Sequence, residues 1–327
     1  MNSRRHLLVA LAGMLVVPVD LMAQQNPTKM KRLGILGAET ASGQASRVSA
    51  LLAGLREQGY VEGKNIVIEY RWAEGKYEQL PGLASELVRL NVDVMVALGI
   101  KAALATKKIT STVPIVIPAT ADPLSTGLIA SLARPGANVT GSAIFGSEMA
   151  AKQLELMREA MPKMTRVAML SNPQNPANES AISALDAAAK LLKMSVRRFD
   201  VQSAADIDVV FAAMEKTRIG GAVVLADTLF VANAGKMVDL AVQKRIFLVG
   251  HATYAENGCV LGYGPNQNEM YRQVAVQIDK IFKGVKPSDI PVEQATRFEL
   301  VVNLKTAKAL RVTIPQSILV RATKVLE

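Results

Sequence analysis

Two apolar runs near residue 100 each lead through a short polar loop into a helical pattern. The runs Val92–Leu98 and Pro114–Pro118 are rich in valine and isoleucine, and their length suits strands buried on both faces rather than helices. The helical patterns cover Ala102–Ile109 and Ser125–Ala133. Strand, loop and helix repeated in this order predict a parallel sheet, which binds ligands at the carboxyl ends of its strands. The loops after these two runs are therefore the first candidates for a binding site.

The same alternation runs through the rest of the chain and predicts two α/β domains with a parallel sheet in each and a ligand cleft between them. In the first half, strands are predicted at Lys31–Gly37, Ile66–Trp72 and Val139–Ile144, helices at Val48–Gln58 and Tyr77–Leu90, and a small polar loop at Ala38–Ser46. In the second half, helices are predicted at Glu148–Ala160, Ala177–Leu192, Ala204–Thr217, Phe230–Lys244, Met270–Phe282 and Leu304–Leu310. Strands are predicted there at Arg166–Leu170, Ser195–Asp200, Gly220–Ala226, Ile246–Val249, Gly258–Gly264 and Phe298–Val302.

Length and composition agree with this organisation. The chain has 327 residues, of which 50% are hydrophobic and 20% charged, as expected for two globular domains. The first domain is expected to contain residues 30–143 and about 254–297, and the second 144–250 and returning segments within 298–327. We expect the chain to cross between the domains near Ala143–Gly146, near Gly250–Tyr254 and again from Phe298.

The first 23 residues have the pattern of a cleavable signal peptide. Arg4 and Arg5 form a basic region, Leu7–Val19 is apolar, and the small residue Ala23 ends an acceptable cleavage site before Gln24. We therefore expect a signal peptide at residues 1–23 and a mature protein in the periplasm.

Two alternatives for the N-terminus stay open at this point. Ser3–Leu8 also loosely resembles a twin-arginine signal, and an uncleaved anchor is the alternative to cleavage, although Gly13, Pro18 and Asp20 interrupt the apolar run. No cysteine lies near the cleavage site, so no lipid attachment is expected. The only cysteine, Cys259, allows no intrachain disulfide.

Charge and composition do not indicate a nucleic-acid-binding protein. The formal net charge is +10, but the basic residues are scattered and only 4% of residues are aromatic. Nucleic-acid-binding proteins typically carry a basic patch in which Lys and Arg are clustered. A basic, solvated surface is the simpler interpretation.

The sequence lacks the usual signatures of catalysis and of metal or cofactor binding. His251 is the only histidine after the signal peptide, and a nucleophilic pair with Cys259 is conceivable, but the apolar setting of Cys259 favours a buried structural thiol. There is no Gly-x-Ser-x-Gly elbow, Walker A loop or His-x-x-x-His spacing. Gly262–Gly264 does not open a helix, as a dinucleotide-binding loop would. We expect no enzyme, no metal and no cofactor.

Several short motifs carry a resemblance to a known family. They are Gly54–Asn65 (GLREQGYVEGKN), Glu69–Gly75 (EYRWAEG), Asp122-Pro123, Leu132–Gly141 (LARPGANVTG), Asn172–Pro176 (NPQNP) and Gly262–Pro265 (GYGP). Together they resemble the substrate-binding proteins of bacterial ABC transporters, over most of the mature chain. The most similar branch includes tryptophan- and other aromatic-amino-acid-binding lipoproteins.

The resemblance implies a type I periplasmic-binding-protein fold, in which two Rossmann-like domains joined by three crossovers close on a small ligand. It also implies delivery of the ligand to a membrane permease driven by an ATPase. The chain departs from the family at Ile100–Ala103, where Thr-Pro-Ala-Ala is commoner, and at Ala121, where glycine is commoner. Both departures lie in expected ligand loops. They therefore leave the identity of the ligand undetermined but do not affect the expected fold.

Family members that bind amino-acid-like ligands surround a carboxylate with hydroxyl and backbone N–H donors of the first domain. In this chain the expected donors are Ser42 and Ser46, the Gly99-Ile100 loop, and Thr120. Helix N-termini in these loops would favour the anion.

The second domain would supply a carboxylate for an amine, with Asp227 as the candidate. Asp227 has an equal alternative as the N-cap of the helix that follows it. Asp122 before Pro123 either contacts ligand or shapes its loop, and Asn172 is a turn residue first and a ligand contact second. Tyr254 is expected to stack on an apolar ligand body.

These patterns lead to one main function and one alternative. The main hypothesis is a monomeric periplasmic receptor that captures an amino-acid-like or other small carboxylate for uptake through an inner-membrane ABC permease. The alternative is a periplasmic sensor or scaffold that presents the same solute to a signalling receptor. An exported enzyme is disfavoured because no nucleophile–base pair is evident.

Overall fold

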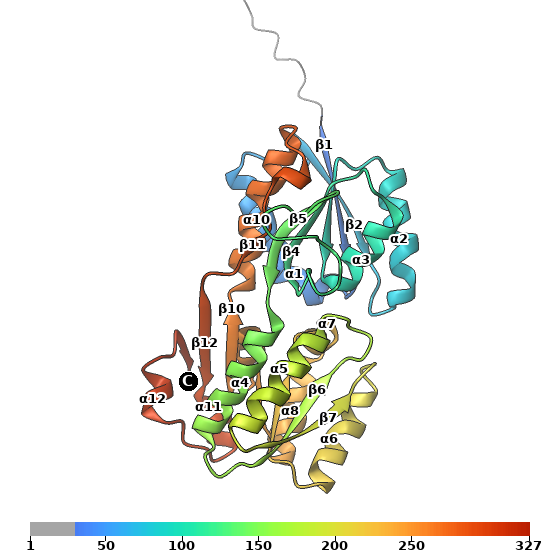
Figure 1. Cartoon of the computed structure of the whole chain (residues 1–327). Coiled ribbons are helices and arrows are strands. Elements are labelled where there is room, and N and C mark those ends of the chain that lie inside the picture. The colour runs from blue at the N-terminus through green and yellow to red at the C-terminus, as the bar shows by residue number, and fades with distance from the viewer. Residues whose placement is uncertain (1–29) are drawn as a thin grey trace, which may run out of the picture.

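The computed structural model describes residues 30–327, so the predicted signal peptide lies outside the described residues. Two open sheets, each covered by helices on both faces, lie one above the other in Figure 1. Alternating residues of each strand face opposite helix layers, which explains why the central strands are apolar throughout. No helix within these residues is long and apolar enough to span a membrane.

The first sheet has six strands, all parallel, in the order β11-β5-β4-β3-β1-β2. They are β1 (Lys31–Gly37), β2 (Ile66–Trp72), β3 (Val94–Leu98), β4 (Ile115–Ala121), β5 (Val139–Ile144) and β11 (Glu293–Gln294). One face packs on α1 (Ala41–Glu57) and α10 (Gln267–Phe282), and the other on α2 (Leu80–Arg89) and α3 (Ile100–Ile109). Two 3₁₀ turns, Tyr77–Gln79 and Pro287–Asp289, complete this part.

The second sheet has seven strands in the order β13-β12-β10-β9-β8-β6-β7. They are β6 (Arg166–Ser171), β7 (Ser195–Asp200), β8 (Gly221–Val224), β9 (Phe247–Gly250), β10 (Leu261–Pro265), β12 (Phe298–Asn303) and β13 (Lys324–Leu326). The helices are α4 (Gly146–Ala160), α5 (Asn178–Leu191), α6 (Asp206–Lys216), α7 (Thr228–Ala232), α8 (Ala234–Lys244), α9 (Ala252–Glu256), α11 (Leu304–Ala309) and α12 (Gln316–Leu319). Among the described residues, only the β10–β12 pair of this sheet is antiparallel, so the sheet is mostly parallel.

The chain passes three times between the sheets. The first passage lies between β5 and α4, within the predicted Ala143–Gly146. The second follows Pro265, later than the predicted Gly250–Tyr254, because β10 pairs with β9 and β12 of the second sheet while α10 packs on α1. The third lies between β11 and β12, immediately before Phe298.

Three predicted local structures are corrected. The helix α1 begins at Ala41 instead of Val48, because the Thr40 hydroxyl caps it by accepting from the Gly43 N–H at 3.2 Å. The segment Ser125–Ala133 forms turns instead of a helix, with Gly127 at a φ of 68°. The predicted helix Phe230–Lys244 is divided at Asn233 into α7 and α8.

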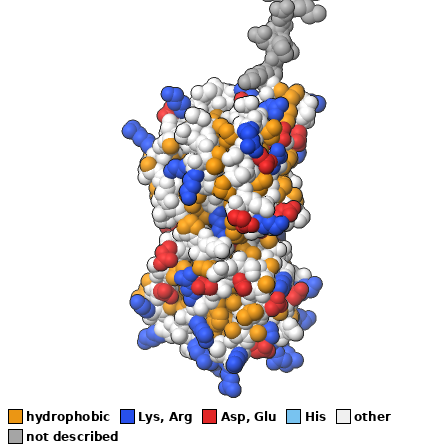
Figure 2. Space-filling model, turned by 90° about the vertical axis from the view of Figure 1, so that its right-hand side faces the viewer, with side chains coloured by type: hydrophobic (Ala, Val, Ile, Leu, Met, Phe, Trp, Pro, Cys, Tyr) orange, Lys and Arg blue, Asp and Glu red, His pale blue; other side chains and the backbone are white. Residues whose placement is uncertain are grey.

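Charged side chains are spread over the surface of both domains. In the face drawn in Figure 2, Lys and Arg occur on both domains with Asp and Glu between them. Most ion pairs join exposed partners, as between Lys152 and Glu155, and such pairs contribute little to stability. The distribution on this face fits the scattered basic residues of the sequence.

Candidate ligand-binding site between the domains

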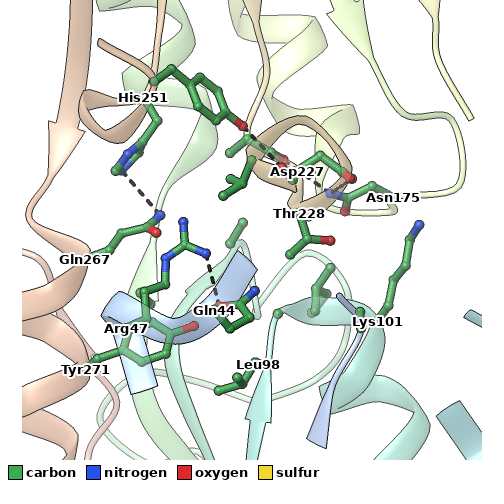
Figure 3. A pocket seen from close by; sticks show the side chains of 18 residues that line it. Gln44, Arg47, Leu98, Lys101, Asn175, Asp227, Thr228, His251, Gln267 and Tyr271 are labelled. Atoms are coloured by element: carbon green, nitrogen blue, oxygen red, sulfur yellow. Dashed lines mark hydrogen bonds between the residues drawn. The ribbon is translucent and has the colours of Figure 1, made fainter. Parts of the chain in front are cut away.

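A cavity of about 80 Å³ lies between the two domains, at the carboxyl ends of strands from both sheets (Figure 3). From the first domain it is lined by residues at or just after the carboxyl ends of β1, β3 and β4 and by side chains of α1 and α10: Ala38, Gln44, Arg47, Leu98, Gly99, Ile100, Lys101, Ala119, Ala121, Gln267 and Tyr271. From the second it is lined by residues that follow β6, β8 and β9: Asn175, Ala226, Asp227, Thr228, Val231, His251 and Tyr254. A ligand here would contact both domains.

Two irregular backbone positions shape the first domain's side of the cavity. Gly99, at a φ of 89°, joins β3 directly to α3, and a Cβ there would lie 3.4 Å from Thr228 Cγ2 of the other domain. The pairing of β4 with β5 shifts register between Ile117 and Thr120, and Ala119 in this bulge has a φ of 49°. Alanine in this left-handed region is strained, a feature that concentrates at functional sites.

Arg47 is a buried cation without an acidic partner in the described part of the chain. It lies on α1 and is 7% exposed. Its Nη1 donates to Gln44 Oε1 at 3.2 Å, and none of the ion pairs formed by residues 30–327 includes it. Buried charges are normally paired, so an unpaired guanidinium on a cavity wall suits an anionic ligand.

Asp227 is held by three donors of its own domain. Its Oδ1 caps α7 by accepting from the Leu229 N–H at 2.8 Å and also accepts from Asn172 Nδ2 at 3.3 Å, while Oδ2 accepts from Asn175 Nδ2 at 2.7 Å. The Tyr254 hydroxyl donates to the Asp227 carbonyl oxygen at 3.2 Å. Asp227 therefore caps its helix and also lines the cavity.

Lys101 lies in the first turn of α3, close to two carboxyl groups without bonding to either. Its Nζ is 3.4 Å from the centroid of the Tyr77 ring and, within the described part of the chain, is buried without a hydrogen-bond partner. Burial lowers the pKa of Lys101, whereas the charges of Asp227 and Glu39 oppose that change. The Tyr77 hydroxyl donates to Glu39 Oε1 at 3.3 Å, and burial raises the pKa of both groups.

His251 closes the side of the cavity next to Arg47. It caps α9 by accepting from the Thr253 N–H at 3.3 Å, and its Nε2 lies 3.4 Å from Gln267 Nε2. Burial, together with the Arg47 charge, lowers the pKa of His251 to about 3. The ring is therefore neutral at physiological pH and serves the cavity as a polar wall.

We expect this buried imidazole to make the protein less stable in acid. The unfolded chain, with a histidine pKa near 6.5, binds a proton before the folded chain does. Neutral His251 therefore makes its full contribution to the free energy of unfolding above pH 6.5. Below pH 6.5 that free energy decreases by up to about 1.4 kcal/mol per pH unit. Urea unfolding between pH 7.5 and 4.5 measures this loss. His251→Asn keeps a capping side chain without titrating, so its stability should fall less steeply, and identical slopes would contradict the assignment.

Cys259 and His251 do not form a catalytic pair. Cys259 is 1% exposed, and burial raises the pKa of its thiol to about 12, which leaves it protonated and poorly nucleophilic. His251 hydrogen-bonds elsewhere. Over residues 30–327, no group of three or more His, Cys, Asp or Glu side chains is placed to hold a metal ion.

Some of the predicted site residues line the cavity, and others lie outside it. Four of them, Gly99, Ile100, Asp227 and Tyr254, line the cavity. Asn172 is fully buried behind Asp227, and Asp122 accepts from the Gly146 N–H at 3.0 Å at the first passage between the domains. Thr120 is buried in β4 outside the cavity, with its hydroxyl unpaired among the described residues. Ser42 and Ser46 line a neighbouring space beside Arg47, because α1 begins earlier than predicted.

Several residues that line the cavity were not predicted, although the sequence pattern around two of them could have identified them. Arg47 falls on the apolar stripe of α1, with Leu51 one turn away, where a charged residue is unusual. Lys101 is one of the residues Ile100–Ala103, at which the chain departs from the commoner family sequence. Gln267 and Tyr271 gave no signal in the sequence, because α10 is brought to the cavity by its tertiary packing on α1 and on the first sheet.

The family model for ABC transporter substrate binding proteins matches residues 40–326. The chain belongs to this family. Its two domains form the predicted type I periplasmic-binding-protein fold. The family binds small ligands, which agrees with a cavity lined from both domains.

Three similar proteins illustrate the relationship. A tyrosine-binding protein of Clostridioides difficile (strain R20291) is 23% identical over 323 residues, covering 94% of this chain and 93% of that one. The crystal structure of a conserved domain protein from Vibrio cholerae is 27% identical with a TM-score of 0.86, covering 91% of this chain and 100% of that one. An ABC domain from Streptococcus pneumoniae in complex with L-Trp is 24% identical with a TM-score of 0.83, covering 90% and 100%. The fold of this substrate-binding protein therefore matches both solved structures over about nine-tenths of its length, and one of the two holds L-Trp.

Proposed function

We propose that this protein is the solute-binding component of an ABC import system, which captures a small organic carboxylate by domain closure and delivers it to an inner-membrane permease. The observation that carries the proposal is the buried, unpaired Arg47 on the wall of a cavity between two domains. A carboxylate would pair with this guanidinium through charge-assisted hydrogen bonds. Membership of the family supports the transport role.

The apolar part of the ligand would lie against the rest of the cavity wall. Leu98, Ile100 and Val231 are apolar, and Tyr254 and Tyr271 present aromatic rings. Aromatic faces and aliphatic side chains favour a compact apolar body. The relatives named for tyrosine and bound to tryptophan make an amino-acid-like solute one candidate. A simple carboxylic acid is the other, because the Arg47 guanidinium requires only the carboxylate.

Domain closure would explain how binding is signalled to the permease. Asp227, Asn175 and Thr228 belong to one domain, whereas Arg47 and Lys101 belong to the other. A ligand that contacts both sets stabilises the closed form by its differential affinity for that form. The protein would act as a monomer in the periplasm after removal of the predicted signal peptide, without catalysis or a cofactor.

A thermal-shift screen of the mature protein tests the proposed ligand class. The panel holds aromatic and aliphatic carboxylates, amino acids and uncharged sugars at equal concentration. Small carboxylates, with or without an amino group, should raise the melting temperature, since a ligand present at 100 times its Kd stabilises the folded state by about 2.7 kcal/mol. A shift with sugars alone, or with no solute of the panel, would contradict the proposal.

A further inference from the structure

Two cations, Arg47 and Lys101, line the same cavity, and neither forms an ion pair with another of the described residues. Arg47 is bonded to Gln44, and Lys101 packs its ammonium on the Tyr77 ring. Figure 3 shows Lys101 extending from α3 toward the domain that carries Thr228 and Asn175, on the side of the cavity away from His251. The Lys101 Nζ is buried and, among residues 30–327, has no hydrogen-bond acceptor. The cavity therefore presents positive charge from two directions.

The carboxylate that could balance a ligand ammonium is already occupied. Asp227 accepts from Leu229, Asn172 and Asn175, which fills three of about four acceptor positions of a carboxylate. The charge of Lys101 also acts on Asp227 and Glu39. An ammonium on the ligand would have to share Asp227 with the ammonium of Lys101, and like charges brought together in a buried site repel each other.

We propose that Lys101 is a specificity-determining residue, and that the solute is an organic carboxylate without an α-ammonium group. Lys101 and Asp227 line the same cavity, so the positive charge of Lys101 opposes a second ammonium that a ligand would bring to Asp227. This inference rests on the proposed function and narrows its ligand class. A carboxylate held by Arg47 then has a second positive charge at the other side of the cavity.

A purely structural role for Lys101 makes a different prediction. If the ammonium only stabilises its contact with Tyr77, its removal changes the melting temperature and affects every ligand equally. If it selects by charge, its removal changes the ratio of affinities between two ligands that differ only in the ammonium group. The ratio is therefore the informative measurement, and it does not depend on how well a variant folds.

Calorimetric titration with two ligand pairs measures this ratio. The pairs are 3-phenylpropanoate with phenylalanine and 4-methylpentanoate with leucine, because the members of each pair share a carbon skeleton. The proteins are the wild type, Lys101→Met, which keeps the chain length without the charge, and Lys108→Met as a matched control. Lys108 lies on the same helix and is exposed.

The wild type should bind the better deaminated acid at least about tenfold more tightly than the matching amino acid, the factor that about 1.4 kcal/mol of repulsion produces. Lys101→Met should reduce that preference to less than about threefold, while Lys108→Met should leave it unchanged.

Three results would overturn the inference, and they differ in what they say about the proposed function. If the wild type binds the amino acid as tightly as the acid, the inference fails and the proposed function stands. If Lys101→Met leaves the preference intact, Lys101 is not the selecting residue and the proposed function again stands. If neither member of either pair binds and no other small carboxylate does, both fail together.

Discussion

Replacing Arg47 by methionine is expected to lower the affinity for a carboxylate ligand by about tenfold to more than a hundredfold, since a hydrogen bond to a charged group contributes roughly 1.5–3 kcal/mol. The guanidinium has no acidic partner among residues 30–327, so its favourable interaction arises when the ligand binds. Methionine at this position of α1 keeps an unbranched apolar side chain without the charge. Calorimetric titration of the tightest ligand found in the thermal-shift screen measures the loss.

The matched control for this change is Arg56→Met, because Arg56 lies on the same helix but is exposed. It should leave the affinity unchanged. The Arg47→Met protein should melt at or above the wild-type temperature without ligand, because a buried charge without a partner is removed. Equal affinities of the Arg47→Met and Arg56→Met proteins would show that Arg47 does not hold the anion.

Asp227→Ala is expected to lower the free energy of unfolding by about 2–5 kcal/mol. The loss of an N-cap costs about 1 kcal/mol, and each buried amide left without its acceptor adds about 1–3 kcal/mol. The amides are those of Asn172 and Asn175, which both donate to this carboxylate. Urea unfolding measures the loss, and Asp239→Ala, which removes an exposed aspartate from α8, should change stability by less than about 0.5 kcal/mol.

The companion variant Asp227→Asn separates the capping role from ligand contact. Asparagine also caps helices well, but its amide nitrogen replaces the oxygen that accepts from Asn175, so this protein should lose about 1–3 kcal/mol and remain more stable than Asp227→Ala. If the ligand carries no ammonium, its affinity should change by less than about threefold, because no direct ion pair is lost. A loss of about tenfold or more for an amino acid would instead identify Asp227 as the partner of its ammonium.

The fold was predictable from the sequence because its strands are short, apolar and regularly spaced. The predicted bounds of Ile66–Trp72 and Ser195–Asp200 coincide with β2 and β7, where turn residues and a clear change of pattern lie on both sides. The second passage between the domains was placed too early, because the partners of β10 are β9 and the distant β12. The local sequence Leu261–Pro265 does not indicate which of the two sheets this strand joins.

The site was less predictable, because its contacts join residues far apart in the chain. The sequence identified the loops that carry Gly99 and Asp227 from the rule that ligands bind at carboxyl ends of parallel strands. It could not separate the capping role of Asp227 from a ligand role, since Asn172 and Asn175 precede it by 55 and 52 residues. It also missed Arg47, because the small residues of Ala41–Ser46 concealed the first turns of α1.

A crystal structure of the protein with the tightest carboxylate from the screen tests the central claim most directly. The account predicts one ligand molecule in the cavity between the domains, with its carboxylate about 2.7–2.9 Å from the guanidinium nitrogens of Arg47, the usual length of a charge-assisted hydrogen bond. Asp227 should remain bonded to Leu229, Asn172 and Asn175. A ligand bound to one domain alone, or a carboxylate that is held without Arg47, would contradict the account.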